Sequence, residues 1–64
     1  MENLMIFGKY RAKISYDPED EVFCGEVLNI NDSVNFYGSS VKELKKTFSN
    51  AIFNYEKMKG WYNG

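Results

Sequence analysis

Polar and apolar residues alternate without interruption between Lys9 and Tyr16. Successive side chains of a strand point to opposite faces of the sheet, so this alternation predicts a half-buried strand over about residues 8–16. One face would direct its side chains toward a core, namely Tyr10, Ala12, Ile14 and Tyr16. The opposite face would carry Lys9, Arg11, Lys13 and Ser15.

Two more strands are predicted, and a turn signal precedes each of them. DPEDE at Asp17–Glu21 places a proline among acidic residues, which favours a solvated turn. NINDS at residues 29–33 is rich in side chains that hydrogen-bond their own backbone. The strands would cover about residues 22–30 and 34–37 and form an antiparallel meander with the first. Gly25 in the middle strand indicates a close approach by another backbone or a large side chain.

The apolar period then lengthens to three or four residues, which is typical of one face of a helix. Ser40 and Glu43 form an S-x-x-E capping box at its start, and Gly60 is a suitable C-terminal stop. These signals predict a helix over about residues 41–59. Its apolar stripe would consist of Val41, Leu44, Phe48, Ala51, Ile52, Tyr55 and Met58.

These elements predict an α+β fold in a single domain, 1–64, with the order β-β-β-α. A three-stranded antiparallel sheet would be covered by the helix on one face only. WYNG at residues 61–64 offers a short fourth strand at a sheet edge. A chain of 64 residues has a marginal core of its own, so further stabilisation is expected. Cys24 is the only cysteine, so no disulfide forms within the chain, and self-association as a homo-oligomer or binding to a partner is expected instead.

Composition argues against an enzyme. The chain has no histidine, which removes Ser-His and Cys-His catalysis and the usual zinc ligands. Cys24 has no basic neighbour in sequence and is interpreted as a small packing residue. The sequence contains neither a phosphate-binding loop nor a long apolar run or signal peptide. We therefore expect a cytoplasmic, non-catalytic protein that has no cofactor, metal site or membrane span.

The acidic turn is the first candidate partner-binding element. It comprises Asp17, Glu19, Asp20 and Glu21. The turn lacks the twelve-residue spacing and central glycine of an EF-hand calcium loop. A solvated hairpin tip is the favoured interpretation, and docking on a basic partner is the functional alternative.

The face of the sheet opposite the helix is the second candidate. Its expected residues are Lys9, Arg11, Lys13, Cys24, Glu26 and Leu28. If Tyr16 lies opposite Phe23, Lys13 faces Glu26; a register slipped by two residues would place Arg11 opposite Glu26 instead. Either register gives a mixed polar and apolar face suited to association. Binding of RNA is disfavoured, because the net charge is -1 and Tyr37 is the only aromatic residue left for stacking there.

A third candidate surface lies on the far side of the helix. Phe53 falls opposite the apolar stripe at about 100° per residue. Together with Trp61 and Tyr62, it would form a second contact surface for a partner.

The order of these motifs resembles the N-terminal domain of HicB-type antitoxins, over Tyr10 to Lys57. The resemblance is carried by the Tyr10/Ala12/Ile14 strand, the acidic tip, Phe23-x-Gly25-x-Val27, INDSV at Ile30–Val34 and GSSVKEL at Gly38–Leu44. It implies a partial ribonuclease-H-like β-β-β-α domain without nuclease activity. Such a domain binds and blocks HicA, a small mRNA-cleaving toxin, and members commonly form dimers or tetramers.

The sequence departs from that family in one respect. A helix-turn-helix or ribbon-helix-helix usually follows the domain, and no DNA-binding segment is expected here, so autorepression is not carried over. Two alternatives remain open. One is a phage or mobile-element inhibitor of a host nuclease or defence complex, and the other is a small nucleic-acid-binding module that uses Lys9, Arg11 and Lys13.

Overall fold

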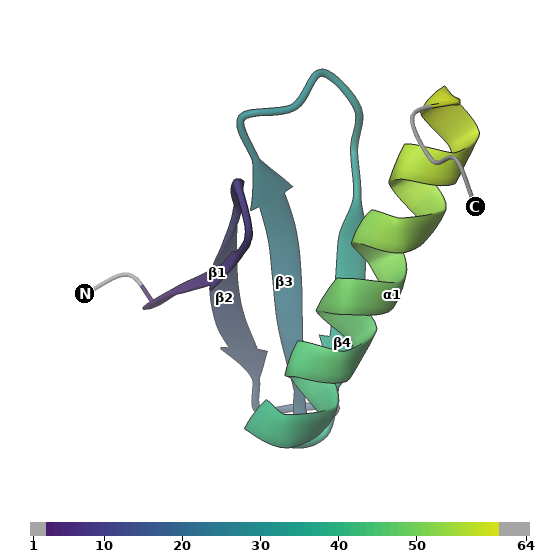
Figure 1. Cartoon of the computed structure of the whole chain (residues 1–64). Coiled ribbons are helices and arrows are strands. Elements are labelled where there is room, and N and C mark those ends of the chain that lie inside the picture. The colour runs from purple at the N-terminus through teal and green to yellow at the C-terminus, as the bar shows by residue number, and fades with distance from the viewer. Residues whose placement is uncertain (1–2, 61–64) are drawn as a thin grey trace.

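The computed structural model describes residues 3–60 as a sheet with one helix across it (Figure 1). The strands are β1 at Asn3–Phe7, β2 at Tyr10–Asp17, β3 at Val22–Leu28 and β4 at Asn35–Gly38. The helix α1 covers Val41–Lys59. The predicted α+β fold, with one helix on one face of an antiparallel sheet, is confirmed.

The strands form a single meander in the order β1-β2-β3-β4. Tyr16 lies opposite Phe23, and Lys13 lies opposite Glu26. The first of the two predicted registers is therefore confirmed, and the register slipped by two residues is wrong. Val27 lies opposite Ala12, and both residues are buried on the inner face of the sheet.

The additional edge strand is formed by residues at the N-terminus of the chain, before the three predicted strands. β1 pairs with β2 and forms an edge, whereas residues 61–64, which offered a strand after the helix, lie outside the described residues. Gly8 and Lys9 form the turn between β1 and β2, so the strand predicted from residue 8 begins at Tyr10. β3 ends at Leu28 rather than at residue 30, because Asn29 has a φ of 62° and leaves the extended region.

Local capping interactions set both ends of α1, and its bounds agree with the prediction. The Ser40 hydroxyl accepts a hydrogen bond from the Glu43 N–H at 3.1 Å. The Glu43 carboxylate accepts from the Ser39 N–H at 2.7 Å, one residue earlier than the predicted capping box requires, and this bond lowers the pKa of Glu43. At the other end, Gly60 has a φ of 79° and its N–H donates to the Lys57 carbonyl at 3.2 Å.

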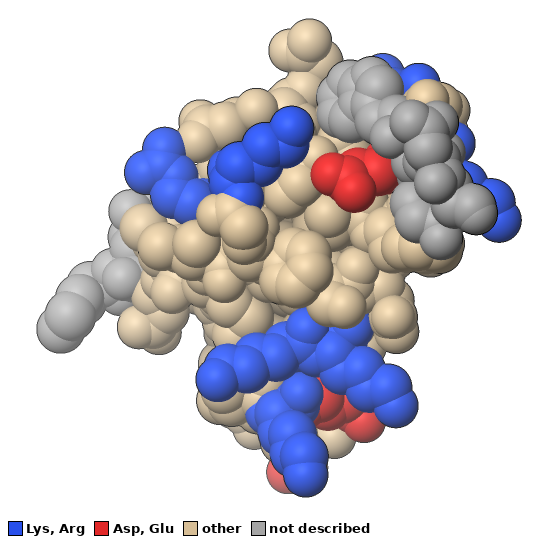
Figure 2. All heavy atoms as spheres, viewed as in Figure 1, with Lys and Arg blue, Asp and Glu red and all other residues tan. Residues whose placement is uncertain are grey.

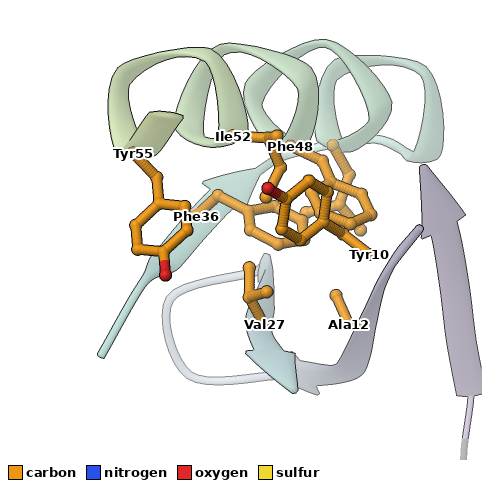
Figure 3. Close-up of a cluster of buried hydrophobic side chains, with 8 residues drawn as sticks. Tyr10, Ala12, Val27, Phe36, Phe48, Ile52 and Tyr55 are labelled. Carbon is orange, nitrogen blue, oxygen red and sulfur yellow. The ribbon is translucent and has the colours of Figure 1, made fainter. Parts of the chain in front are cut away.

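The core lies between α1 and the inner face of the sheet (Figure 3). The Phe36 and Phe48 rings stack with their centroids 4.6 Å apart. A Cβ at Gly25 would overlap the Phe36 ring, which is the close approach predicted for this glycine. The buried hydrophobic residues are Tyr10, Ala12, Val27, Phe36, Leu44, Phe48, Ile52 and Tyr55.

The predicted helical stripe is too long at both ends. Val41 is 53% exposed and Met58 is 68% exposed. α1 packs chiefly on β4 and β3, so its terminal turns extend past the strands that cover its middle. Within residues 3–60, no helix has the length and apolar character that crossing a membrane requires.

Polar contacts join the C-terminal half of α1 to the sheet. The Tyr10 hydroxyl donates to Glu56 Oε2 at 2.8 Å. Burial, followed by this bond to a carboxylate, raises the pKa of Tyr10 to about 12. Lys59 Nζ lies 2.8 Å from Asp32 Oδ2, and this contact raises the pKa of Lys59. The loop after β3 is thereby held against the end of the helix.

Candidate partner-binding surfaces

The sheet face opposite α1 carries both apolar and charged side chains. We call it the outer face. β1 contributes Leu4 and Ile6, which lie opposite Lys13 and Arg11 of β2 and therefore on the same side of the sheet. In the described part of the chain, the outer face comprises Leu4, Ile6, Arg11, Lys13, Ser15, Asp17, Val22, Cys24, Glu26, Leu28, Asn35 and Tyr37.

Apolar groups on the outer face are exposed at both edges of the sheet. Leu4 and Ile6 are 51% and 68% exposed on β1, and Tyr37 is 58% exposed on β4. Leu28 and Cys24 lie between them on β3 and are half-buried. An exposed apolar surface interleaved with charged groups is typical of sites that bind other macromolecules.

The charged residues of the outer face are mixed in sign. Lys13 lies opposite Glu26, and Arg11 lies opposite Leu28. Cross-strand neighbours of opposite charge stabilise a sheet by about 0.2–1 kcal/mol. The face therefore has no continuous positive strip of the kind that captures nucleic acid.

A hollow on the outer face lies beside the β4 edge. Its side chains come from β2, β3 and β4, and it places Lys13, Glu26 and Tyr37 around one depression. The remaining lining residues are Ser15, Cys24, Gly25 and Asn35. A basic group, an acidic group and a phenol around one hollow suit hydrogen bonding to a polar partner surface.

Lys9 does not continue the row formed by Arg11 and Lys13. It lies in the turn before β2, and its Nζ lies 5.6 Å from the centroid of the Tyr10 ring. The alternation in sequence extended one residue too far, because a two-residue turn between β1 and β2 replaces the start of the predicted strand. Lys9 consequently lines a separate hollow at the end of the sheet, together with Tyr10 and Tyr55.

The acidic turn is a hairpin tip between β2 and β3. Asp17 is half-buried, and its Oδ1 accepts hydrogen bonds from the Glu19 and Asp20 N–H groups at 3.0 and 3.4 Å. Glu21 closes the turn with a φ of 55°. Asp17 therefore shapes the tip, while the exposed side chains of Glu19, Asp20 and Glu21 present its negative charge.

The helix exposes one further aromatic group and a positive cluster. Phe53 is 44% exposed and lies outside the core, as predicted, whereas Trp61 and Tyr62 lie outside the described residues. Figure 2 shows basic side chains gathered over the N-terminal part of α1, which contains lysines and no arginine. Exposed lysines in this part of the helix are Lys42, Lys45 and Lys46.

Among residues 3–60, no group of three or more Cys, Asp and Glu side chains is arranged to hold a metal ion. The acids of the hairpin tip are spread around a turn, and Glu43 is engaged by Ser39.

Sequence reasoning missed the contribution of β1 to the outer face. NLMIF is an apolar run without alternation, so no period identified residues 3–7 as a strand. The available signal was the glycine at position 8, which follows the run and permits a tight turn into β2. Tyr37 was the aromatic residue left for this face, and the structure places it there.

Comparison of the chain with protein-family models, with curated proteins and with solved structures finds no match.

Proposed function

We propose that this chain is a HicB-like antitoxin that neutralises a HicA-type mRNA-cleaving toxin by covering it. The resemblance between Tyr10 and Lys57 motivates the proposal. The confirmed α+β fold, an antiparallel sheet with one helix on one face, is compatible with it, although an α+β fold alone does not specify a function. Inhibition by occlusion requires a binding surface and no catalytic group of the inhibitor's own.

The outer face is the observation that carries the proposal. It leaves Leu4, Ile6 and Tyr37 exposed around charged groups on a face that α1 does not cover. Burial of such residues in a complex supplies hydrophobic free energy, and the polar groups determine how the partner is oriented.

The negative charge of the hairpin tip favours a partner with a positively charged surface. Glu19, Asp20 and Glu21 project their charge from one end of the β2–β3 hairpin. Complementary charge increases association rates more than it increases affinity. A ribonuclease that binds RNA presents a positive surface, so the tip would steer the inhibitor toward the toxin's substrate-binding side.

Two alternatives use the same surfaces. A phage or mobile-element inhibitor of a host nuclease or defence complex would follow the same physical logic with a different target. A nucleic-acid-binding module is favoured by the hollow that brings Lys13 and Tyr37 together, but Glu26 in the same hollow would repel a phosphate. Binding of labelled RNA to the purified chain at low salt would support this second alternative.

The cellular setting is part of the proposal. An antitoxin of this kind would act in the cytoplasm, bind its toxin as a protein partner and assemble as a dimer or tetramer. Neither a cofactor nor a metal is required for occlusion.

Growth rescue tests the proposed function. The proposal requires a HicA-type ribonuclease in the same genome; the chain is co-expressed with that ribonuclease, and growth of the bacterial culture is measured. Arg11→Glu combined with Tyr37→Ala alters the outer face on β2 and β4, leaves the residues of β1 unchanged, and should reduce protection at least tenfold in surviving cells. Met58→Ala removes an even more exposed apolar side chain from the helix, at 68% against 58% for Tyr37, and should retain protection. Full protection by the outer-face variant would contradict the proposed use of this face.

A further inference from the structure

β1 forms an edge of the sheet that lacks the usual protective features. It is the first strand in the order β1-β2-β3-β4, so its second side has no strand partner in the described chain. Natural edge strands are commonly blocked by charged residues, proline or a bulge. Asn3–Phe7 contains no charged residue and no proline, and it pairs with β2 without a bulge.

The side chains of this edge are apolar and accessible. Leu4 and Ile6 are more than half exposed on the outer face, and Phe7 is 44% exposed on the inner face. Met5, which lies between Leu4 and Ile6 in sequence, points to the inner face and is half-buried. An apolar edge of this kind favours pairing with another strand.

The β1–β2 turn determines which backbone groups face outward. Gly8, the first of two turn residues, has a φ of 59°, as a tight hairpin turn with glycine in that position requires. Phe7 and Tyr10 flank this turn and form the pair that exchanges hydrogen bonds. Hydrogen-bonded and non-hydrogen-bonded pairs alternate along an antiparallel ladder, so the N–H and C=O groups of Leu4 and Ile6 point away from β2.

We propose that β1 pairs antiparallel with β1 of a second copy of this chain, about a two-fold axis at Met5. In this register Leu4 lies opposite Ile6 of the partner subunit, and the outward backbone groups of both residues form hydrogen bonds. Met5 lies opposite its own equivalent, and Asn3 lies opposite Phe7 of the partner subunit. The two sheets become one continuous sheet with both outer faces on the same side.

Self-complementarity makes a second copy the favoured occupant of this edge. A two-fold interface presents the same residues to one another, so a strand with charges of a single sign would bring like charges close together. Asn3–Phe7 has no charge, and the proposed register places apolar Leu4 on apolar Ile6 on the outer face. The register also pairs every residue of β1, whereas centring on Leu4 or Ile6 would leave residues of the strand unpaired.

This inference deepens the self-association expected under the proposed function, by naming its surface and register. The test measures association of the chain with itself, so it can fail while inhibition of a ribonuclease stands, and the reverse is also true. The measurement is the mass of the full chain in solution, by sedimentation equilibrium over a range of concentrations.

Charge placement on β1 tests the register. Leu4→Glu with Ile6→Glu places each glutamate beside Lys13 or Arg11 of its own chain, which favours folding, but opposite a glutamate of the second copy. Leu4→Lys with Ile6→Glu places opposite charges across the same interface. Val41→Glu, at a similarly exposed site in the first turn of α1, is the control.

The unmodified chain and Val41→Glu should form a concentration-dependent dimer. The variant with two glutamates should dimerise at least tenfold more weakly, and the variant of opposite charges should regain most of that loss. Circular dichroism should show the same folded spectrum for all four proteins. An unmodified chain that is monomeric at all concentrations would overturn the proposal. Dimerisation that is not weakened by the two glutamates would also overturn it, as would a failure of the opposite charges to restore dimerisation.

Discussion

Tyr10 is the buried residue whose ionisation is most strongly linked to the fold. Its hydroxyl donates to Glu56 Oε2 at 2.8 Å, joining the start of β2 to the last turns of α1. The rest of the side chain is buried, with its ring edge-on to Tyr55 at a centroid distance of 6.3 Å. Both burial and the bond to a carboxylate favour the neutral phenol.

We predict that Tyr10→Phe flattens the loss of stability at alkaline pH. The pKa of Tyr10 is about 12 in the folded chain, above the ordinary tyrosine value of 10.0, so the contribution of Tyr10 to stability is complete below pH 10. As the pH rises from 10 toward 12, the unfolded chain ionises first and the free energy of unfolding decreases. The variant should lose about 1 kcal/mol at neutral pH and show a smaller alkaline decrease.

Urea denaturation at a series of pH values measures this effect. Tyr37→Phe is the matched control, because Tyr37 is exposed and its change should leave the alkaline decrease intact. Some decrease should persist in Tyr10→Phe, since the pKa of Lys59 is also raised by Asp32. An unchanged alkaline slope in Tyr10→Phe would show that this phenol is not coupled to folding.

Elements with strong local signals agreed best with the sequence predictions. α1 spans 41–59 as predicted, because Ser40 and Gly60 act through contacts within a few residues. The alternation of polar and apolar residues also predicted which side chains of β2 and β3 lie on each face of the sheet. Gly25 was correctly interpreted as a site where another group approaches closely. These features depend on short-range geometry that the sequence encodes directly.

Features that depend on tertiary pairing were missed. β1 has no alternation, and its strand conformation depends on pairing with β2 after the Gly8 turn. The outer face was consequently predicted without Leu4 and Ile6, and Lys9 was wrongly placed in the same row as Arg11. The structural role of Asp17 also depends on the three-dimensional course of the hairpin tip, which composition does not reveal.

At the hairpin tip we predict that stability and association can be separated. Asp17→Ala removes the acceptor for the Glu19 and Asp20 N–H groups and should destabilise the domain by about 0.5–1.5 kcal/mol. Neutralising Glu19, Asp20 and Glu21 together should leave the melting temperature nearly unchanged but slow association with a basic ribonuclease. The rate difference should shrink as salt is added, because salt screens exposed charges.

Thermal melts and stopped-flow association at low and moderate salt measure the two effects. The control is a variant in which Lys57, an exposed charge in the last turn of α1 and remote from the tip, is neutralised. Equal association rates for the neutralised tip and the unmodified chain at low salt would remove its steering role.

At the scale of the whole molecule, the described chain is a single two-layer domain. α1 covers one face of the sheet, and the outer face and the β1 edge remain open. A chain of 64 residues buries a limited core, so contacts made by these open surfaces would matter for stability as well as for binding. The proposed inhibitor would therefore use the outer face for its target and β1 for a second copy of itself.

The most direct test is a titration of RNA cleavage by a purified HicA-type ribonuclease with this protein. We predict that cleavage falls in proportion to the added protein and ceases near one binding site per toxin, while the protein alone cleaves no RNA. Cleavage that continues unchanged in a large molar excess of the folded protein would contradict inhibition by occlusion.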